Sequence, residues 1–251
     1  MAVALALALS ALPACGVGEI GGPGGGGGDP TGGPDAGPGQ NAADAAPNAP
    51  DAAPPDYSMT VIPTGATTLT LGTATAFQIA LVSERFVGPV ELSVTGAPGS
   101  WNVRFEPSAT AVLAYDGTAT IDLIVEVPTN GDAGEIALSV DALAAPGVRS
   151  QPAALVVSNE LIVDIAAGTG SGTHAFPSRS DINVGTVVTI RNSDTTAHRI
   201  HSNNDDQGFP HQPDDMGQGE SYSVTITGTG ELNYYCHVHE VVAGVGQLRA
   251  Q

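Results

Sequence analysis

Short runs of alternating apolar and polar residues dominate the chain from Tyr57 onward. In the stretches TLTLGTATAFQIALVS (68–83) and SYSVTITGTGELNYYC (221–236) the alternation is clearest, and Gly, Pro or Asp separates one run from the next. A period of two is typical of strands, because successive side chains of a strand point to opposite faces. No stretch of helical length shows a convincing 3.6-residue period. The pattern predicts an all-β protein.

The strand-like runs fall into two sets, and each set is large enough for a small β-sandwich. The first set lies within residues 57–157 and includes PVELSVTG, ATIDLIVEVP and EIALSVDALA. The second set lies within 158–251 and includes ELIVDIAAG, GTVVTIRNS, HRIHS, SYSVTITGTGELNYYC and VGQLRAQ. We therefore expect two all-β domains with a boundary between 157 and 158.

Residues 16–56 have a different character, since Gly, Pro, Ala and Asp make up most of this stretch. It offers only Val17 and Ile20 as sizeable apolar side chains, which is too little to offset the entropy of ordering the chain. We expect a disordered tether here.

The first 15 residues, MAVALALALSALPAC, form an apolar run of the length of a signal-peptide core, too short to cross a bilayer as a helix. The run ends in LPAC and resembles the lipobox of a bacterial lipoprotein, although the usual basic segment is missing. The resemblance implies that Cys15 is lipidated, with the protein anchored to a bacterial membrane in the periplasm or at the cell surface. The alternative is an ordinary cleaved signal with an incidental cysteine.

The first strand-rich region, 57–157, resembles the immunoglobulin-like modules of bacterial surface proteins in phrases such as FVGPVELSVTG and WNVRFEP. It has no cysteine pair and so lacks the inter-sheet disulfide of antibody domains. It has no histidine either, and Trp101 and Phe105 are most simply explained by packing. We expect a spacer module.

Charge excludes one class of partner. The chain carries a formal net charge of -19, and its only cationic side chains are seven arginines. Nucleic-acid binding depends on neutralising phosphates with Lys and Arg, so we expect no such partner.

All six histidines lie in the last region: His174, His198, His201, His211, His237 and His239. One cysteine, Cys236, lies beside them, and the other is Cys15. A disulfide between the two cysteines would join the N-terminus to the last strands, and sequence alone leaves it open. A thiolate with two imidazoles is a ligand set that suits copper, with a thioether as the usual weak axial ligand.

Two longer stretches resemble the two halves of a small blue-copper protein, or cupredoxin. INVGTVVTIRNSDTTAHRI (182–200) matches a strand and polar turn before the first histidine ligand, and QGESYSVTITGTGELNYYCHVH (218–239) ends in the Tyr-x-Cys-x-x-His motif. The resemblance implies a Greek-key β-sandwich over 158–251 and one type 1 copper held by His198, Cys236 and His239. Strand alternation favours His198 over His201 as the inward-facing residue, because side chains three apart lie on opposite faces.

The axial position departs from the family. Amicyanin-like spacing places Val242 where a methionine is usual, and plastocyanin-like spacing places Gly244 there. Neither side chain can coordinate, so Val242 is expected to be a non-ligating axial residue that favours Cu(I) and raises the reduction potential. We interpret Met216, the remaining methionine of this region, as a turn or core residue.

The other histidines allow several interpretations. His201, His211 and His237 are candidates for an accessory metal site or for a docking surface, and the simpler explanation is a solvated surface histidine. Asn192 precedes the His198 turn and is expected to brace it by hydrogen bonds.

The favoured function is single-electron transfer, with a redox partner protein such as a cytochrome or an oxidase, by a monomer. The alternative is a copper-binding or copper-delivery module without an electron-transfer partner. We do not expect an enzyme, because the chain has no G-x-S-x-G elbow and no H-E-x-x-H pair. Cys236 with His239 as a nucleophile and base would also lack a residue to orient them.

Overall fold

The computed structural model describes residues 53–167, 179–202, 212–237 and 246–251. These residues form fifteen strands, and no helix occurs among them. The predicted all-β class is confirmed. No helix in the described part of the chain is long and apolar enough to cross a membrane.

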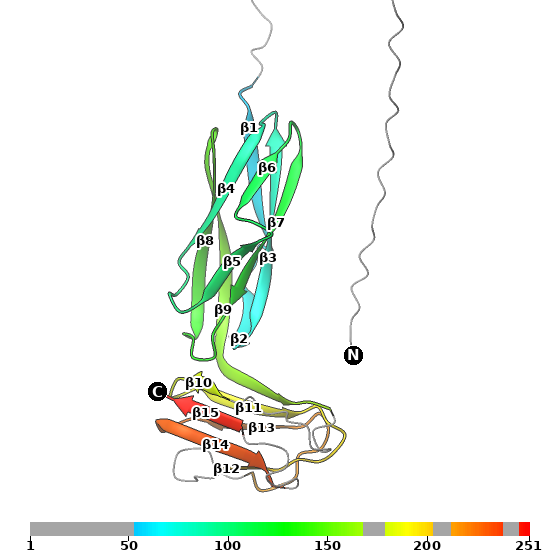
Figure 1. The fold of residues 1–251 in the computed structure, drawn as a ribbon, viewed down its shortest axis with the longest axis vertical. Coiled ribbons are helices and arrows are strands. Elements are labelled where there is room, and N and C mark those ends of the chain that lie inside the picture. The colour runs from blue at the N-terminus through cyan, green and yellow to red at the C-terminus, as the bar shows by residue number, and fades with distance from the viewer. Residues whose placement is uncertain (1–52, 168–178, 203–211, 238–245) are drawn as a thin grey trace, which may run out of the picture. The chain divides into compact units, whose positions relative to one another are not determined.

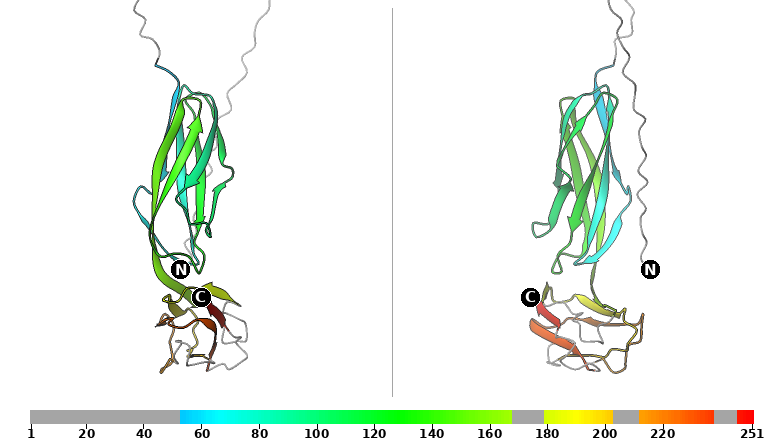
Figure 2. Two further views of the ribbon diagram at one scale, coloured as in Figure 1. Left: turned by 90° about the vertical axis from the view of Figure 1, so that its left-hand side faces the viewer. Right: turned by 45° about the vertical axis from the view of Figure 1, so that its right-hand side comes forward.

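The N-terminal strands build two facing sheets, whose layers can be followed in Figures 1 and 2. One sheet has the order β1-β3-β7-β5, and the other contains β8, β4 and β6 in that order, with β2 attached through β9. The strands are β1 (Asp56–Ile62), β2 (Thr67–Leu71), β3 (Ala74–Glu84), β4 (Gly88–Thr95), β5 (Asn102–Glu106), β6 (Thr110–Leu113), β7 (Thr118–Glu126) and β8 (Gly134–Ala144).

Alternation explains how these sheets face each other. In β3, the side chains of Phe77, Ile79 and Leu81 are fully buried, while those between them point away from the core. Trp101 is also buried, in keeping with a packing role. The resemblance of 57–157 to immunoglobulin-like modules stays a prediction.

Strand β9 (Gly147–Ile165) belongs to both sets of strands (Figure 1). Its first part pairs with β8 and β2, and from Glu160 to Ile165 it pairs in parallel with β11. The predicted boundary between 157 and 158 therefore falls inside one continuous strand. Buried apolar residues alternate up to Val157 and again from Leu161, and only the three polar residues 158–160 interrupt them, which is too short a stretch to be recognised as a linker.

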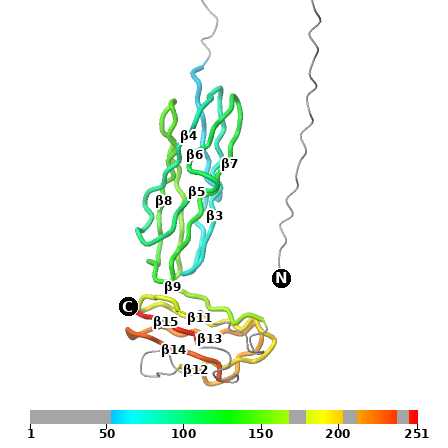
Figure 3. Tube along the Cα trace, viewed as in Figure 1, coloured from blue at the N-terminus to red at the C-terminus, as the bar shows by residue number. Residues whose placement is uncertain are grey.

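The C-terminal strands complete the predicted second set. They are β10 (Ser180–Ile182), β11 (Val187–Asn192), β12 (Ile200–Ser202), β13 (Ser221–Thr225), β14 (Gly230–Cys236) and β15 (Gly246–Ala250). One sheet has the order β10-β15-β14-β12, while β11 and β13 extend the sheet that contains β9. The Cα trace in Figure 3 shows β12 beside β14, the two strands that carry the chemistry.

Candidate metal centre

The register of β12 against β14 aligns the candidate ligands. Ile200 lies opposite Cys236, and the backbone N–H of His237 donates to the carbonyl of Arg199 at 2.8 Å, which extends the ladder toward His198. His198 lies two residues before Ile200 and thus on the same face. His198 and Cys236 are therefore diagonal neighbours of an antiparallel pair, whose Cα atoms usually lie about 7 to 8 Å apart.

Both side chains are enclosed. His198 and Cys236 are each 0% exposed. A metal ion forms bonds of about 2.3 Å to sulfur and 2.0 to 2.1 Å to an imidazole nitrogen, so one ion can join diagonal neighbours of this kind. The donor chemistry and the burial of these two residues fit copper.

Asp194 orients the His198 ring. Its Oδ2 lies 3.2 Å from Nε2 of His198, and Asp194 is itself almost fully buried. A carboxylate oxygen accepts hydrogen bonds, so this contact favours the tautomer with its proton on Nε2. Nδ1, which is also buried, is then the ring nitrogen with the lone pair for a metal.

Asn192 braces the loop between β11 and His198, as predicted. Its Nδ2 donates to the carbonyl of Thr196 at 2.9 Å and to that of Met216 at 2.8 Å. Its Oδ1 accepts the backbone N–H of Asp194 at 2.9 Å. One fully buried amide thus fixes the loop that carries Asp194 and holds it against the neighbouring segment.

Met216 lies directly beside His198. The two residues exchange backbone hydrogen bonds of 3.0 and 2.7 Å, and the Met216 side chain is buried although exposed residues surround it in sequence. Directly opposed residues of an antiparallel pair project from the same face. Met216 is therefore buried on the face that carries His198. Its interpretation as a turn or core residue, and not a ligand, stays a prediction.

His201 and His237 lie on the outer face of the same two strands. Their rings are stacked with centroids 4.3 Å apart, and the His201 ring is 5.8 Å from that of Tyr235. His198 faces inward and is buried, whereas His201 is partly exposed, so the predicted alternation between them is confirmed.

Several predicted site residues lie outside the described residues, namely His239, Val242, Gly244, His211, His174 and Cys15. Within 53–167, 179–202, 212–237 and 246–251 there is no group of three or more His, Cys, Asp or Glu side chains that could hold a metal ion. The roles of His198, Cys236 and His239 as ligands stay predictions.

Sequence reasoning did not identify Asp194. Its position in NSDTTAH, four residues before the histidine, resembles an ordinary polar turn. Only the structure reveals that the carboxylate turns inward and meets the ring. The preference of Asp for bonding to nearby backbone groups in turns gives no signal of this ring contact.

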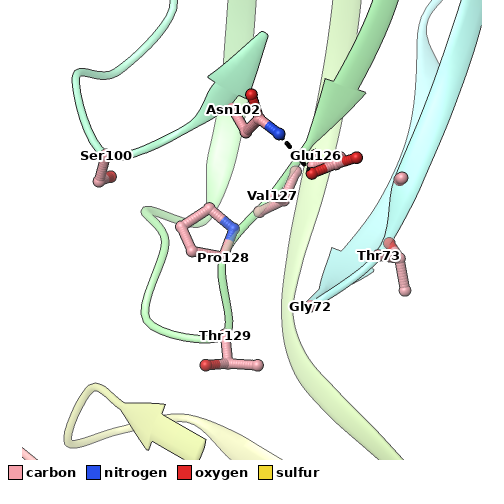
Figure 4. Close-up of a pocket in the computed structure, with 9 residues that line it drawn as sticks. Gly72, Thr73, Ser100, Asn102, Glu126, Val127, Pro128 and Thr129 are labelled. Carbon is pink, nitrogen blue, oxygen red and sulfur yellow. Dashed lines mark hydrogen bonds between the residues drawn. The ribbon is translucent and has the colours of Figure 1, made fainter.

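The N-terminal strands contain a depression of about 370 Å³ that is unrelated to this chemistry (Figure 4). Asn102 and Glu126, which are paired between β5 and β7, both line it. Hydrogen bonds from Arg104 and from Asn102, the latter at 2.7 Å, lower the pKa of the Glu126 carboxyl. No histidine or cysteine lines it. The depression therefore offers none of the soft ligands that copper requires.

A buried thiol and a buried imidazole on neighbouring strands of an all-β unit define a candidate soft-metal site. No protein-family model matches the chain. Plastocyanin from Pisum sativum is 26% identical over 111 residues, which are 40% of this chain and 66% of that protein, just under two thirds. Plastocyanin from Fritillaria agrestis is 26% identical over 152 residues, 57% of this chain and 92% of that protein. These relatives support a cupredoxin domain within this chain.

Solved structures of cupredoxins also align with it. A purple cupredoxin from Nitrosopumilus maritimus is 24% identical, with 37% of this chain and 98% of that chain covered and a TM-score of 0.30. A methionine-to-alanine variant of amicyanin in its Cu(I) form is 24% identical, with 38% and 86% covered and a TM-score of 0.31. TM-scores this low support no conclusion about function by themselves.

Proposed function

We propose that the chain carries single electrons through a type 1 copper held by His198, Cys236 and His239. The observation that carries the proposal is the complete burial of His198 and Cys236 on one face of adjacent strands. The similarity to plastocyanins supports the same function. Copper, when bound, supplies the Cu(I)/Cu(II) couple.

The protein's own residues would keep the site nearly unchanged between the two oxidation states. Asp194 holds the His198 ring at Nε2, and Asn192 holds the loop that carries Asp194. Burial excludes water from the thiol and the imidazole. A site fixed by such contacts needs little rearrangement when it gains or loses an electron, which suits electron transfer better than substrate turnover.

We further propose an extracytoplasmic location. The plastocyanin relatives are chloroplast proteins by name, and the lipobox-like LPAC sequence suits a lipoprotein anchored through Cys15. The tether 16–56 and a spacer of 57–157 would then hold the copper domain away from the membrane, within reach of a cytochrome or an oxidase. We do not assign an enzymatic activity to the chain.

The alternative function is copper binding or delivery without a redox partner. The stacked His201 and His237 rings favour it, because a delivery protein benefits from imidazoles that solvent can reach.

Voltammetry of the copper-loaded chain separates the two functions. An electron carrier is expected to give a reversible one-electron wave whose two peaks stay close together as the scan rate rises, because the site does not rearrange. Copper that stays bound but gives no reversible wave would reject electron transfer and leave the delivery function.

A further inference from the structure

The outer face of β12 and β14 brings two imidazoles together. His201 lies opposite Tyr235 in the register, and His237 directly follows the last residue of β14, two residues after Tyr235. The His201 and His237 rings meet with centroids 4.3 Å apart and planes 22° from parallel. Diagonal neighbours on a sheet are not always in contact, so this short ring separation shows that both side chains lean toward one another.

The surroundings of this pair can accommodate a cation. Arg199 lies opposite His237 on the ladder, but its guanidinium donates to Asp215 at 2.8 Å, so its charge is balanced by a carboxylate. His201 is partly exposed and His237 is exposed, so an ion and its remaining water ligands can reach both rings.

We propose that His201 and His237 together bind one borderline divalent ion, such as Cu²⁺ or Zn²⁺, at a solvent-facing site. Imidazole nitrogens are preferred ligands of these ions. Two metal–nitrogen bonds of about 2.0 to 2.1 Å can join rings at this separation. The rings must turn from near-parallel so that their lone pairs converge, and the broad torsion about the Cβ–Cγ bond of histidine allows this at small cost.

The outer site shares no ligand with the inner ligand set. Cys236 lies between Tyr235 and His237 in sequence, so its side chain points to the opposite face of β14, where it is buried. The outer site would therefore fill whether or not the inner residues hold copper. If the outer site binds no metal, the proposed electron transfer through the inner site is unaffected. If the inner site holds no copper, the outer site can still bind its ion.

Zinc titration of the chain carrying Cys236→Ser tests the proposal, since that change removes the inner thiolate. Calorimetry is expected to show a Zn²⁺ site whose affinity falls at least tenfold in His201→Ala and also in His237→Ala, about 1.4 kcal/mol each. His174→Ala, which removes another histidine of the same region, is the matched control and should leave the affinity unchanged.

A second readout needs no further substitution. In the same Cys236→Ser chain, Zn²⁺ is expected to shift the imidazole proton resonances of His201 and His237 together, at one equivalent. Affinity that depends on only one of these residues, or on neither, would overturn the proposal. So would shifts confined to other histidines.

Discussion

Replacing Cys236 by serine is expected to abolish the intense visible absorption of the copper-loaded protein. Such absorption arises from charge transfer between a thiolate and Cu(II), and a serine hydroxyl does not ionise to give an equivalent donor near neutral pH. Copper bound only through imidazoles would absorb weakly. Absorption spectra of the two copper-loaded proteins, recorded at equal copper content, make the comparison.

Cys15→Ser provides the matched control, because it removes the only other cysteine. This variant should keep the full absorption. The serine at 236 would place a buried hydroxyl where a thiol was, at a cost of about 1 to 3 kcal/mol, so thermal unfolding should accompany the spectra. A strong band that survives in a folded Cys236→Ser protein would contradict the assignment of Cys236 as the thiolate ligand.

Gly246→Ala is expected to destabilise the C-terminal strands strongly. Tyr234 and Gly246 are paired across β14 and β15, and the Tyr234 ring lies directly over the glycine. A Cβ on residue 246 would lie 2.1 Å from Cζ and 2.5 Å from Cε2 of Tyr234. The ring is fully buried and cannot swing out, so the cost should reach the upper end of overpacking, about 3 kcal/mol.

Denaturant unfolding of the metal-free chain measures this effect. Gly217→Ala is the control, because a Cβ there would meet its nearest atom, Oε2 of Glu220, at an ordinary 3.5 Å. It should change the free energy of unfolding by much less than Gly246→Ala. Equal stability of the two variants would mean that Tyr234 does not fill the space above Gly246.

Alternation was enough to predict the fold class and most strands of the second region. It works there because each strand buries one face, as in β14, where Leu232, Tyr234 and Cys236 are buried in turn. Strand β10 was not predicted, since its three residues SDI are too few to show a period. The shared strand β9 was also not recognised, because only the three polar residues 158–160 interrupt its alternation between the two sets of strands.

For the site, the sequence alone predicted that His198 faces inward and that Asn192 braces its loop. The motif suggested Cys236, but its burial depends on pairing with β12, which is a tertiary contact. Asp194 and the stack of His201 on His237 could not be predicted, since both depend on side-chain directions across loops or between strands. The roles of His239 and Val242 rest on the resemblance and stay predictions.

The most direct test of the central claim is the electron paramagnetic resonance spectrum of the chain loaded with one equivalent of Cu(II). Copper bound by the Cys236 thiolate, His198 and His239 is expected to show the narrow parallel hyperfine splitting of a type 1 site, because the unpaired electron is shared with sulfur. A wide splitting, typical of copper held only by nitrogen and oxygen, would contradict the type 1 assignment and with it the proposed electron transfer.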